Sequence, residues 1–157
     1  PEALMGQFSD RPWSARFAEM GDASEQKFLE KVEGKCERWG FNRPEGVHMP
    51  SLPERVRSAP DFVQSNPQRF VECKGLGRNQ QLSIKLATLG SLHWWNGLMP
   101  VHVFVWDSHK KRSITVRLED LDALIQSPGV VNVDYFDDRK FVFKVPADAV
   151  FDLEDVT

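Results

Sequence analysis

Two carboxylates and a lysine lie close together in one short segment, and their types and spacing suit metal-dependent chemistry. Asp61 opens one run of β-forming residues, and the next such run, 69–74, contains Glu72 and Lys74. Residues 65–68 between the runs are Ser-Asn-Pro-Gln, a composition typical of a turn. The pattern predicts a β-hairpin that brings the three charged side chains to one end of a sheet.

The expected register of this hairpin places the two carboxylates opposite each other. Counting outward from a four-residue loop sets Asp61 against Glu72, with side chains about 5 Å apart. Like charges at that distance destabilise a sheet unless positive charge lies between them. Lys74 is on the same face as Glu72, because side chains alternate along a strand. The other predicted pairs are Phe62 with Val71, Val63 with Phe70 and Gln64 with Arg69.

Such an arrangement has the groups needed to hydrolyse a phosphodiester. Asp61 and Glu72 can hold Mg²⁺ or Mn²⁺, which prefer oxygen ligands, and the backbone carbonyl of Cys73 is a further candidate ligand. A bound metal polarises the phosphate and lowers the pKa of an attacking water. Lys74 can orient that water or neutralise charge on the phosphoryl oxygens. We therefore expect two carboxylate ligands with Lys74 as the catalytic base.

The same residues resemble a known family. Pro60-Asp61, followed after a short hairpin by Glu72-Cys73-Lys74, is similar to the PD-(D/E)XK nuclease motif, with no substitution at its key positions. The resemblance covers roughly residues 21–118, and the order of elements looks most like the archaeal Holliday junction resolvases. It implies a restriction endonuclease-like fold and a structure-directed DNA endonuclease of recombination or repair. The alternatives are an exonuclease, a flap or nicking nuclease of the same superfamily, or a silent DNA-binding module.

The resemblance also implies a glutamate on the first helix near the metal. Asp22, with Glu25 three positions later, forms a capping-box pattern, and a helix is predicted from there to Gly40. At 100° per residue, Glu25 falls at the centre of the apolar face and is the candidate third ligand. The alternative is that it serves only in the capping box. The apolar face comprises Phe28, Leu29, Val32, Cys36 and Trp39.

Members of this family also place a glutamine or lysine early in the helix that follows the E-x-K strand. Leucines at helical spacing predict a helix over 80–95. Gln80, Gln81 and Lys85 are the candidates, and Gln81 and Lys85 would lie one turn apart. The alternative is an exposed polar face. Trp94-Trp95 at the end of this helix could stack on unpaired bases, but such a pair is more typical of a core residue beside a surface lid.

The remaining elements complete one predicted domain over residues 1–157. It is an α/β domain with a central mixed sheet flanked by helices and an added C-terminal hairpin. Its parts are an irregular arm (1–20), a nuclease core (21–126), a β-hairpin (130–145) and a loose acidic tail (146–157). Within the core we expect a proline-rich loop (41–60) with a short strand near Val47 and Met49, a strand buried on both faces (101–106) with His102 as a core histidine, a second strand (114–118) and a short helix (119–126).

Positive charge is concentrated in the middle of the chain. Residues 55–117 contain 10 Lys and Arg against 3 Asp and Glu, whereas residues 118–157 contain 3 against 10. Local field governs association with a polyanion, so DNA is the expected partner. A chance segregation of solvated charges is the alternative. The candidate DNA contacts are Arg55, Arg57, Arg78, Gln81, Lys85, Lys110, Lys111 and Arg112.

Other features restrict the class of protein. Two cysteines, Cys36 and Cys73, are too few for a disulfide framework. No apolar stretch approaches the roughly 20 residues of a membrane span, and no secretion signal is visible. We expect a cytoplasmic protein with no membrane association and no nucleotide cofactor. A homodimer is expected if four-way junctions are cut, because matched nicks need two symmetry-related sites.

Overall fold

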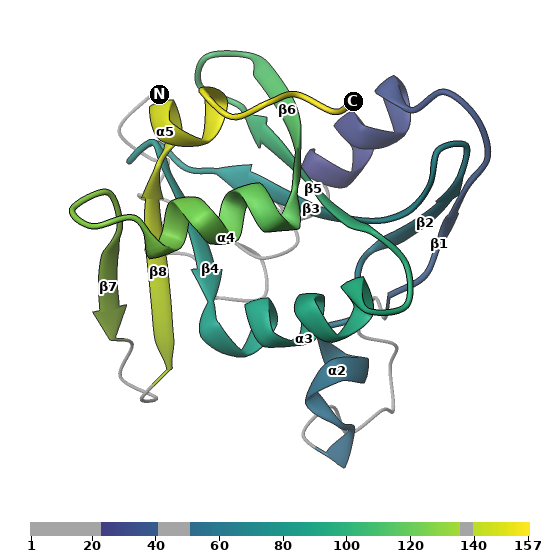
Figure 1. Ribbon diagram of the computed structural model, residues 1–157. Coiled ribbons are helices and arrows are strands. Elements are labelled where there is room, and N and C mark those ends of the chain that lie inside the picture. Colours follow the sequence, from purple (N-terminus) through teal and green to yellow (C-terminus); the bar gives the residue numbers. More distant parts are fainter. Residues whose placement is uncertain (1–22, 41–50, 136–139) are drawn as a thin grey trace, which may run out of the picture.

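The computed structural model describes residues 23–40, 51–135 and 140–157. In these ranges the chain is a mixed α/β structure whose central mixed sheet is flanked by helices, as predicted (Figure 1). The predicted irregular arm and the short strand near Val47 and Met49 lie outside the described residues. The helices that are described are too short or too polar to cross a membrane.

The central sheet has five strands in the order β1-β2-β3-β5-β6. Only β3 and β5 run parallel, and the other neighbours are antiparallel. As its apolar sequence predicts, β5 is buried on both faces except at His102. The strands are β1 (Cys36–Arg38), β2 (Phe62–Ser65), β3 (Gln68–Leu76), β5 (Val101–Asp107) and β6 (Arg112–Arg117).

The hairpin formed by β2 and β3 has the predicted register. The pairs Phe62–Val71, Val63–Phe70 and Gln64–Arg69 are all confirmed. The loop is shorter than predicted, because Ser65 also pairs with Gln68. The ladder ends at Phe62, so Asp61 lies immediately before β2 and not inside it.

A second, three-stranded sheet has the order β4-β8-β7. It consists of β4 (Gln81–Lys85), β7 (Asn132–Tyr135) and β8 (Phe141–Pro146), so the C-terminal hairpin is confirmed. The prediction of a helix over 80–95 is wrong for residues 81–85, which form β4 and pair with β8. Leu82 and Ile84 alternate with polar residues at the period of a strand, and both are buried.

The first helix is also shorter than predicted. Residues 23–31 are helical, and the helix ends before Gly34, whose φ of +100° few residues with a side chain adopt. The segment beyond it extends as β1 along β2. The prediction of one helix to Gly40 is therefore wrong, and Leu29, assigned to the apolar face, is 49% exposed.

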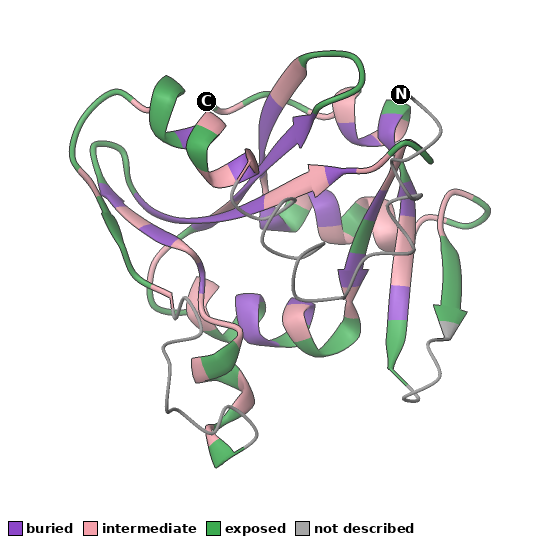
Figure 2. Cartoon of the chain, turned by 180° about the vertical axis from the view of Figure 1, so that it is seen from behind, coloured by how far each residue is buried: buried purple, intermediate pink, exposed green. Residues whose placement is uncertain are grey.

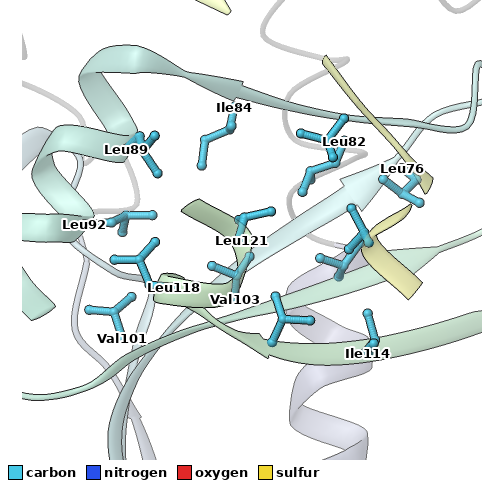
Figure 3. Close-up of a cluster of buried hydrophobic side chains, with 14 of the residues drawn as sticks. Leu76, Leu82, Ile84, Leu89, Leu92, Val101, Val103, Ile114, Leu118 and Leu121 are labelled. Atoms are coloured by element: carbon cyan, nitrogen blue, oxygen red, sulfur yellow. The ribbon is translucent and has the colours of Figure 1, made fainter. Parts of the chain in front are cut away.

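The helices and the second sheet divide the apolar side chains into two cores on opposite faces of the central sheet. The helix over 23–31 covers one face, where Phe28 packs against Phe62 and Phe104. The larger core on the other face receives Leu82 from β4 and Leu89 from α3 (Figure 3). Buried residues are concentrated in the inner strands of the central sheet, whereas β7, most of β1 and the outer helix surfaces are exposed (Figure 2). The remaining helices are α2 (Glu54–Arg57), α3 (Leu86–Asn96), α4 (Leu118–Gln126) and α5 (Ala147–Phe151).

The acidic C-terminal segment is held against the central sheet. The Val156 amide donates to the Thr115 carbonyl at 2.8 Å, and the Thr115 amide donates to the Asp155 carboxylate at 3.2 Å. Glu154 pairs with Arg117 at 2.8 Å. The prediction of a loose tail is wrong, because Glu154 and Asp155 bind residues of β6.

Candidate active site

Asp61 reaches across the end of the hairpin to β3. Its Oδ2 accepts a hydrogen bond from the Cys73 amide at 2.8 Å. Burial, and repulsion by the neighbouring Glu72 carboxylate, raise the pKa of Asp61 well above its usual range. The Cys73 amide and the Lys74 ammonium oppose this rise only in part. The hairpin therefore brings together the carboxylates that the sequence predicts.

Glu72 and Lys74 form an ion pair on one face of β3. The Lys74 Nζ lies 2.9 Å from Glu72 Oε1, with Glu72 buried and the Lys74 side chain 27% exposed. Burial alone would lower the pKa of Lys74, but the carboxylates of Glu72 and Asp61 outweigh it and raise that pKa. Lys74 is therefore an ammonium ion at neutral pH. This protonation state suits charge neutralisation better than the predicted role of base.

Glu25 approaches the site from the helix over 23–31, but it is already bound. Its carboxylate accepts a hydrogen bond from Arg38 Nη2 at 2.5 Å. That bond is the main cause that raises the pKa of Arg38, and Asp61 contributes to the same rise. Glu25 also adds to the repulsion felt by Asp61. The charge of Glu25 therefore acts on Asp61, but a metal would have to compete with Arg38 for the Glu25 carboxylate.

Sequence reasoning missed Arg38, because it assigned residues 36–38 to a helix. In the structure these residues form β1, and Arg38 pairs with Phe62, the residue after Asp61. The Arg38 guanidinium also lies 4.8 Å from the centroid of the Phe62 ring. Gly34 was the one sequence signal that could have ended the helix early.

If a metal binds here, the described residues offer it two carboxylate side chains, Asp61 and Glu72, and not three. Within residues 23–40, 51–135 and 140–157, no three or more His, Cys, Asp or Glu side chains form a group that could hold a metal ion. Glu25 as a direct third ligand therefore gains no support. The chemistry of Asp61 and Glu72 nevertheless fits a hard cation, because such a cation prefers oxygen ligands and would relieve the repulsion that remains between them.

Gln81 and Lys85 are not brought together in the way predicted. They lie on β4 with Ser83, on the face opposite Leu82 and Ile84, and do not follow each other along a helix. Gln80, which precedes β4, donates from Nε2 to Asp107 Oδ1 at 3.0 Å. The predicted helical placement of these residues is wrong, because the segment has a strand period, and their part in the site stays a prediction.

Asp107, at the end of β5, is a buried carboxylate that, unlike Asp61, is surrounded by hydrogen-bond donors. It accepts hydrogen bonds from Gln80 Nε2 (3.0 Å), the amides of His109 and Lys110 (both 3.1 Å) and Arg112 Nε (3.0 Å). Burial alone would raise the pKa of Asp107, but these donors lower it below its usual range.

The predicted basic patch at the turn between β5 and β6 is partly neutralised. Arg112 binds Asp107 and also donates to Asp148 at 3.2 Å. The Lys110 Nζ lies 3.6 Å from the same Asp148 carboxylate. Lys111 and Arg78 are exposed residues in turns and remain candidate phosphate contacts.

An aromatic cluster adjoins the carboxylates. Trp39 and Phe70 lie 5.4 Å apart between ring centroids, and Trp95 contacts them at 5.7 and 5.5 Å. Trp94 extends the cluster, 5.0 Å from Trp95. We use the name aromatic cluster for Trp39, Phe70, Trp94 and Trp95.

The predicted DNA contacts on α2 flank this aromatic cluster. The Arg55 guanidinium lies 4.8 Å from the centroid of the Trp94 ring. Arg57 is paired with Glu54 at 2.5 Å. Since α2 packs against α3, Arg55 is held beside the end of the helix that carries the two tryptophans.

His102 has a hydrogen-bond partner, as predicted, but it is half-buried and not part of the core. Its Nδ1 lies 2.8 Å from Arg69 Nη1, so Nδ1 accepts and the ring is neutral. Burial, together with the charge of Arg69, lowers the pKa of His102 to about 4. It has no part in the candidate site.

Comparison with known proteins gives no relative for this chain. No family model matches it, and no curated protein or solved structure is similar to it. Function is therefore inferred from the geometry and charge of the residues above.

Proposed function

We propose that this chain is a divalent-metal-dependent DNA nuclease of the PD-(D/E)XK type. Asp61 and Glu72 would hold Mg²⁺ or Mn²⁺, and Lys74 would act on the scissile phosphodiester. The observation that carries this proposal is the meeting of two carboxylates beside an ammonium, with the pKa of Asp61 raised by its surroundings. A divalent cation would relieve the repulsion that the fold imposes.

The backbone of Cys73 offers a third oxygen. The ladder ends at Phe62–Val71, and if its register continued, Pro60 would lie opposite Cys73. Proline has no amide hydrogen, so the Cys73 carbonyl gains no ladder partner from that side. The Cys73 amide already donates to Asp61. A proline before Asp61 would in this way leave the Cys73 carbonyl available to the metal.

A metal held there would supply a Lewis acid and a more acidic bound water. Lys74 would neutralise charge that develops on the phosphoryl oxygens, which its raised pKa supports. Glu72 positions this ammonium through their 2.9 Å ion pair. Glu25, fixed by Arg38, would act from an outer position on the charge of Asp61.

The order of elements supports a restriction endonuclease-like core. A helix on one face precedes the antiparallel β2–β3 hairpin, and β5 then adds parallel to β3. Structure-directed endonuclease activity of the junction resolvase type, with a homodimer, is the specific form we favour. The described residues form the central sheet, its helices and one small sheet, and contain no separate sequence-reading domain.

The test is cleavage of a panel of labelled DNAs in Mg²⁺ or Mn²⁺: linear, nicked, flap, fork, four-way and single-stranded. Wild type should cut at least one of them, and excess EDTA should stop it. Asp61→Asn and Lys74→Ala should be inactive, whereas Asp152→Asn, a change at an exposed carboxylate, should match wild type. A protein that binds the panel without cutting it would be the silent DNA-binding module instead.

A further inference from the structure

The backbone places the aromatic cluster next to the residues that carry both carboxylates of the candidate site. The backbone amide of Trp39 donates to the Asp61 carbonyl at 2.8 Å. Phe70 lies on the same face of β3 as Glu72, two residues earlier, a separation of about 7 Å along a strand. A group that contacts Trp39 would therefore lie beside the proposed reaction centre.

Two of the four rings are open to solvent. Trp39 is 48% exposed and Trp94 is 45% exposed. Both are supported from beneath by Trp95, which they contact edge-on at 5.7 and 5.0 Å. The Trp95 Nε1 donates to the Arg55 carbonyl at 2.8 Å, which fixes the supporting ring. The cluster is a rigid surface that presents aromatic area to solvent.

A cation accompanies the exposed rings. Arg55 lies over Trp94 and, among the residues that the structure describes, has no carboxylate partner. Its neighbour Glu54 is occupied by Arg57 and by the Ser58 hydroxyl. A surface hollow of about 370 Å³ lies between α2 and α3, with Arg55, Ser91 and Trp94 in its lining. Aromatic faces next to an arginine suit bases and phosphates together.

We propose that the aromatic cluster binds unpaired nucleobases of a strand whose backbone passes Asp61 and Glu72. Trp39 and Trp94 would stack on the bases, and Arg55 would contact a phosphate. The substrate would then be single-stranded or splayed beside the scissile bond, because bases inside a duplex have both faces covered by their neighbours. The inference rests on the proposed nuclease function for the course of the strand, whereas stacking itself needs no catalysis.

The test measures binding without cleavage, in EDTA and again in Ca²⁺. Wild type is titrated with a labelled thymidine strand of about 12 nucleotides, an abasic strand of equal length and charge, and a blunt duplex. The thymidine strand should quench tryptophan fluorescence and bind roughly tenfold or more tightly than the abasic strand. A uridine strand tests whether RNA is bound equally.

Variants then locate the stacking surface. Trp39→Leu and Trp94→Leu should each weaken binding of the thymidine strand by about 5- to 100-fold, whereas Trp39→Phe should retain most of it. Leu98→Ala is the matched control, since Leu98 is 65% exposed and lies just beyond the same helix. Circular dichroism verifies folding.

The outcomes separate the two proposals. Equal affinity for base-bearing and abasic strands, or a preference for the duplex, would overturn the stacking inference, and this comparison needs only wild type. Folded leucine variants with unchanged affinity would overturn it as well. If the protein binds strands in a base-dependent way but cuts none of the DNAs, the stacking inference holds and the proposed nuclease function is wrong.

Discussion

Asp61 and Asp107 are carboxylates at strand ends of the same sheet, and their surroundings have opposite effects. Asp107 is completely buried and accepts hydrogen bonds from four donors, one of them the Arg112 guanidinium. Asp61 accepts from the Cys73 amide and faces the like charge of Glu72. The pKa of Asp107 is lowered, whereas that of Asp61 is raised.

The difference shows how a structural carboxylate can be told from a candidate ligand. Hydrogen bonds to a charged group contribute about 1.5–3 kcal/mol each, so the donors around Asp107 can offset its burial. The β2–β3 hairpin instead brings Asp61 close to Glu72, and the Cys73 amide and Lys74 offset the resulting rise in the pKa of Asp61 only in part. A buried carboxylate whose charge is compensated only in part indicates a candidate site for a cation.

Catalysis should depend on one of these carboxylates and not on the other. Asp61→Asn should lower the cleavage rate by roughly a thousand-fold, because the amide weakens cation binding at the phosphate. Asp107→Asn, assayed at a temperature where it remains folded, should cut within about tenfold of wild type. Single-turnover rates in Mn²⁺ measure both. Equal losses would mean that the comparison does not identify the site.

Stability should show the reverse pattern. Asp107→Ala should lower the free energy of unfolding by about 3 kcal/mol, because it removes the acceptor for four donors. Asp148→Ala is the matched control, since Asp148 binds the same Arg112 but has an 81% exposed side chain. Its loss should be below about 1 kcal/mol. Urea unfolding measures both, and similar losses would contradict the structural role of Asp107.

The hairpin that carries the site could be predicted because its signals are local. Alternation at period two, a Ser-Asn-Pro turn and directly opposed pairs fix the register without knowledge of the rest of the fold. The juxtaposition of Asp61, Glu72 and Lys74 follows from that register. The buried strand β5 was equally predictable, because its apolar run has no polar face.

The errors arose where distant contacts decide between local alternatives. Leu82 and Leu86 fit a helical spacing, but Leu82 and Ile84 also fit a strand, and pairing with β8 selects the strand. The aromatic cluster joins Trp39, Phe70 and Trp94, which are far apart in sequence, so it could not be predicted. The burial expected for the Trp94-Trp95 pair is confirmed, since Trp95 is partly buried and Trp94 is exposed, and the same burial suits the stacking surface proposed above.

A cation should distinguish the two carboxylates by binding only one of them. Mn²⁺ or Mg²⁺ at 100 times its dissociation constant should stabilise wild type by about 2.7 kcal/mol through preferential binding to the folded state. Asp61→Asn should lose most of this gain. Asp107→Asn should gain as much from the metal as wild type does, although its metal-free stability is lower. Thermal unfolding with metal, and again after EDTA, measures this stabilisation in wild type and in both variants. Equal stabilisation of wild type and Asp61→Asn would place any metal elsewhere.

The smallest effect is the dependence of metal-free stability on pH, and its sign differs between the two carboxylates. The raised pKa of Asp61 means that the folded protein holds its proton more tightly than the unfolded chain does. The resulting stability is complete below the unfolded pKa of about 3.9 and is lost as pH rises through the raised value. The lowered pKa of Asp107 gives stability above about 3.9 that is lost as pH falls.

Asp61→Asn should therefore be more stable than wild type at neutral pH when no metal is present. The gain should reach up to about 1 kcal/mol, the scale of a like-charge pair across a ladder, because the amide removes the repulsion from Glu72. The gain should shrink as pH falls through the raised pKa of Asp61, since the wild-type carboxyl then becomes neutral too. Glu72→Gln is the sharpest control: it removes the same repulsion but leaves the Lys74 ammonium without its 2.9 Å partner, so it should not stabilise. Urea unfolding in EDTA across this pH range measures all three proteins, and a gain for Asp61→Asn that is independent of pH would show that repulsion is not its cause.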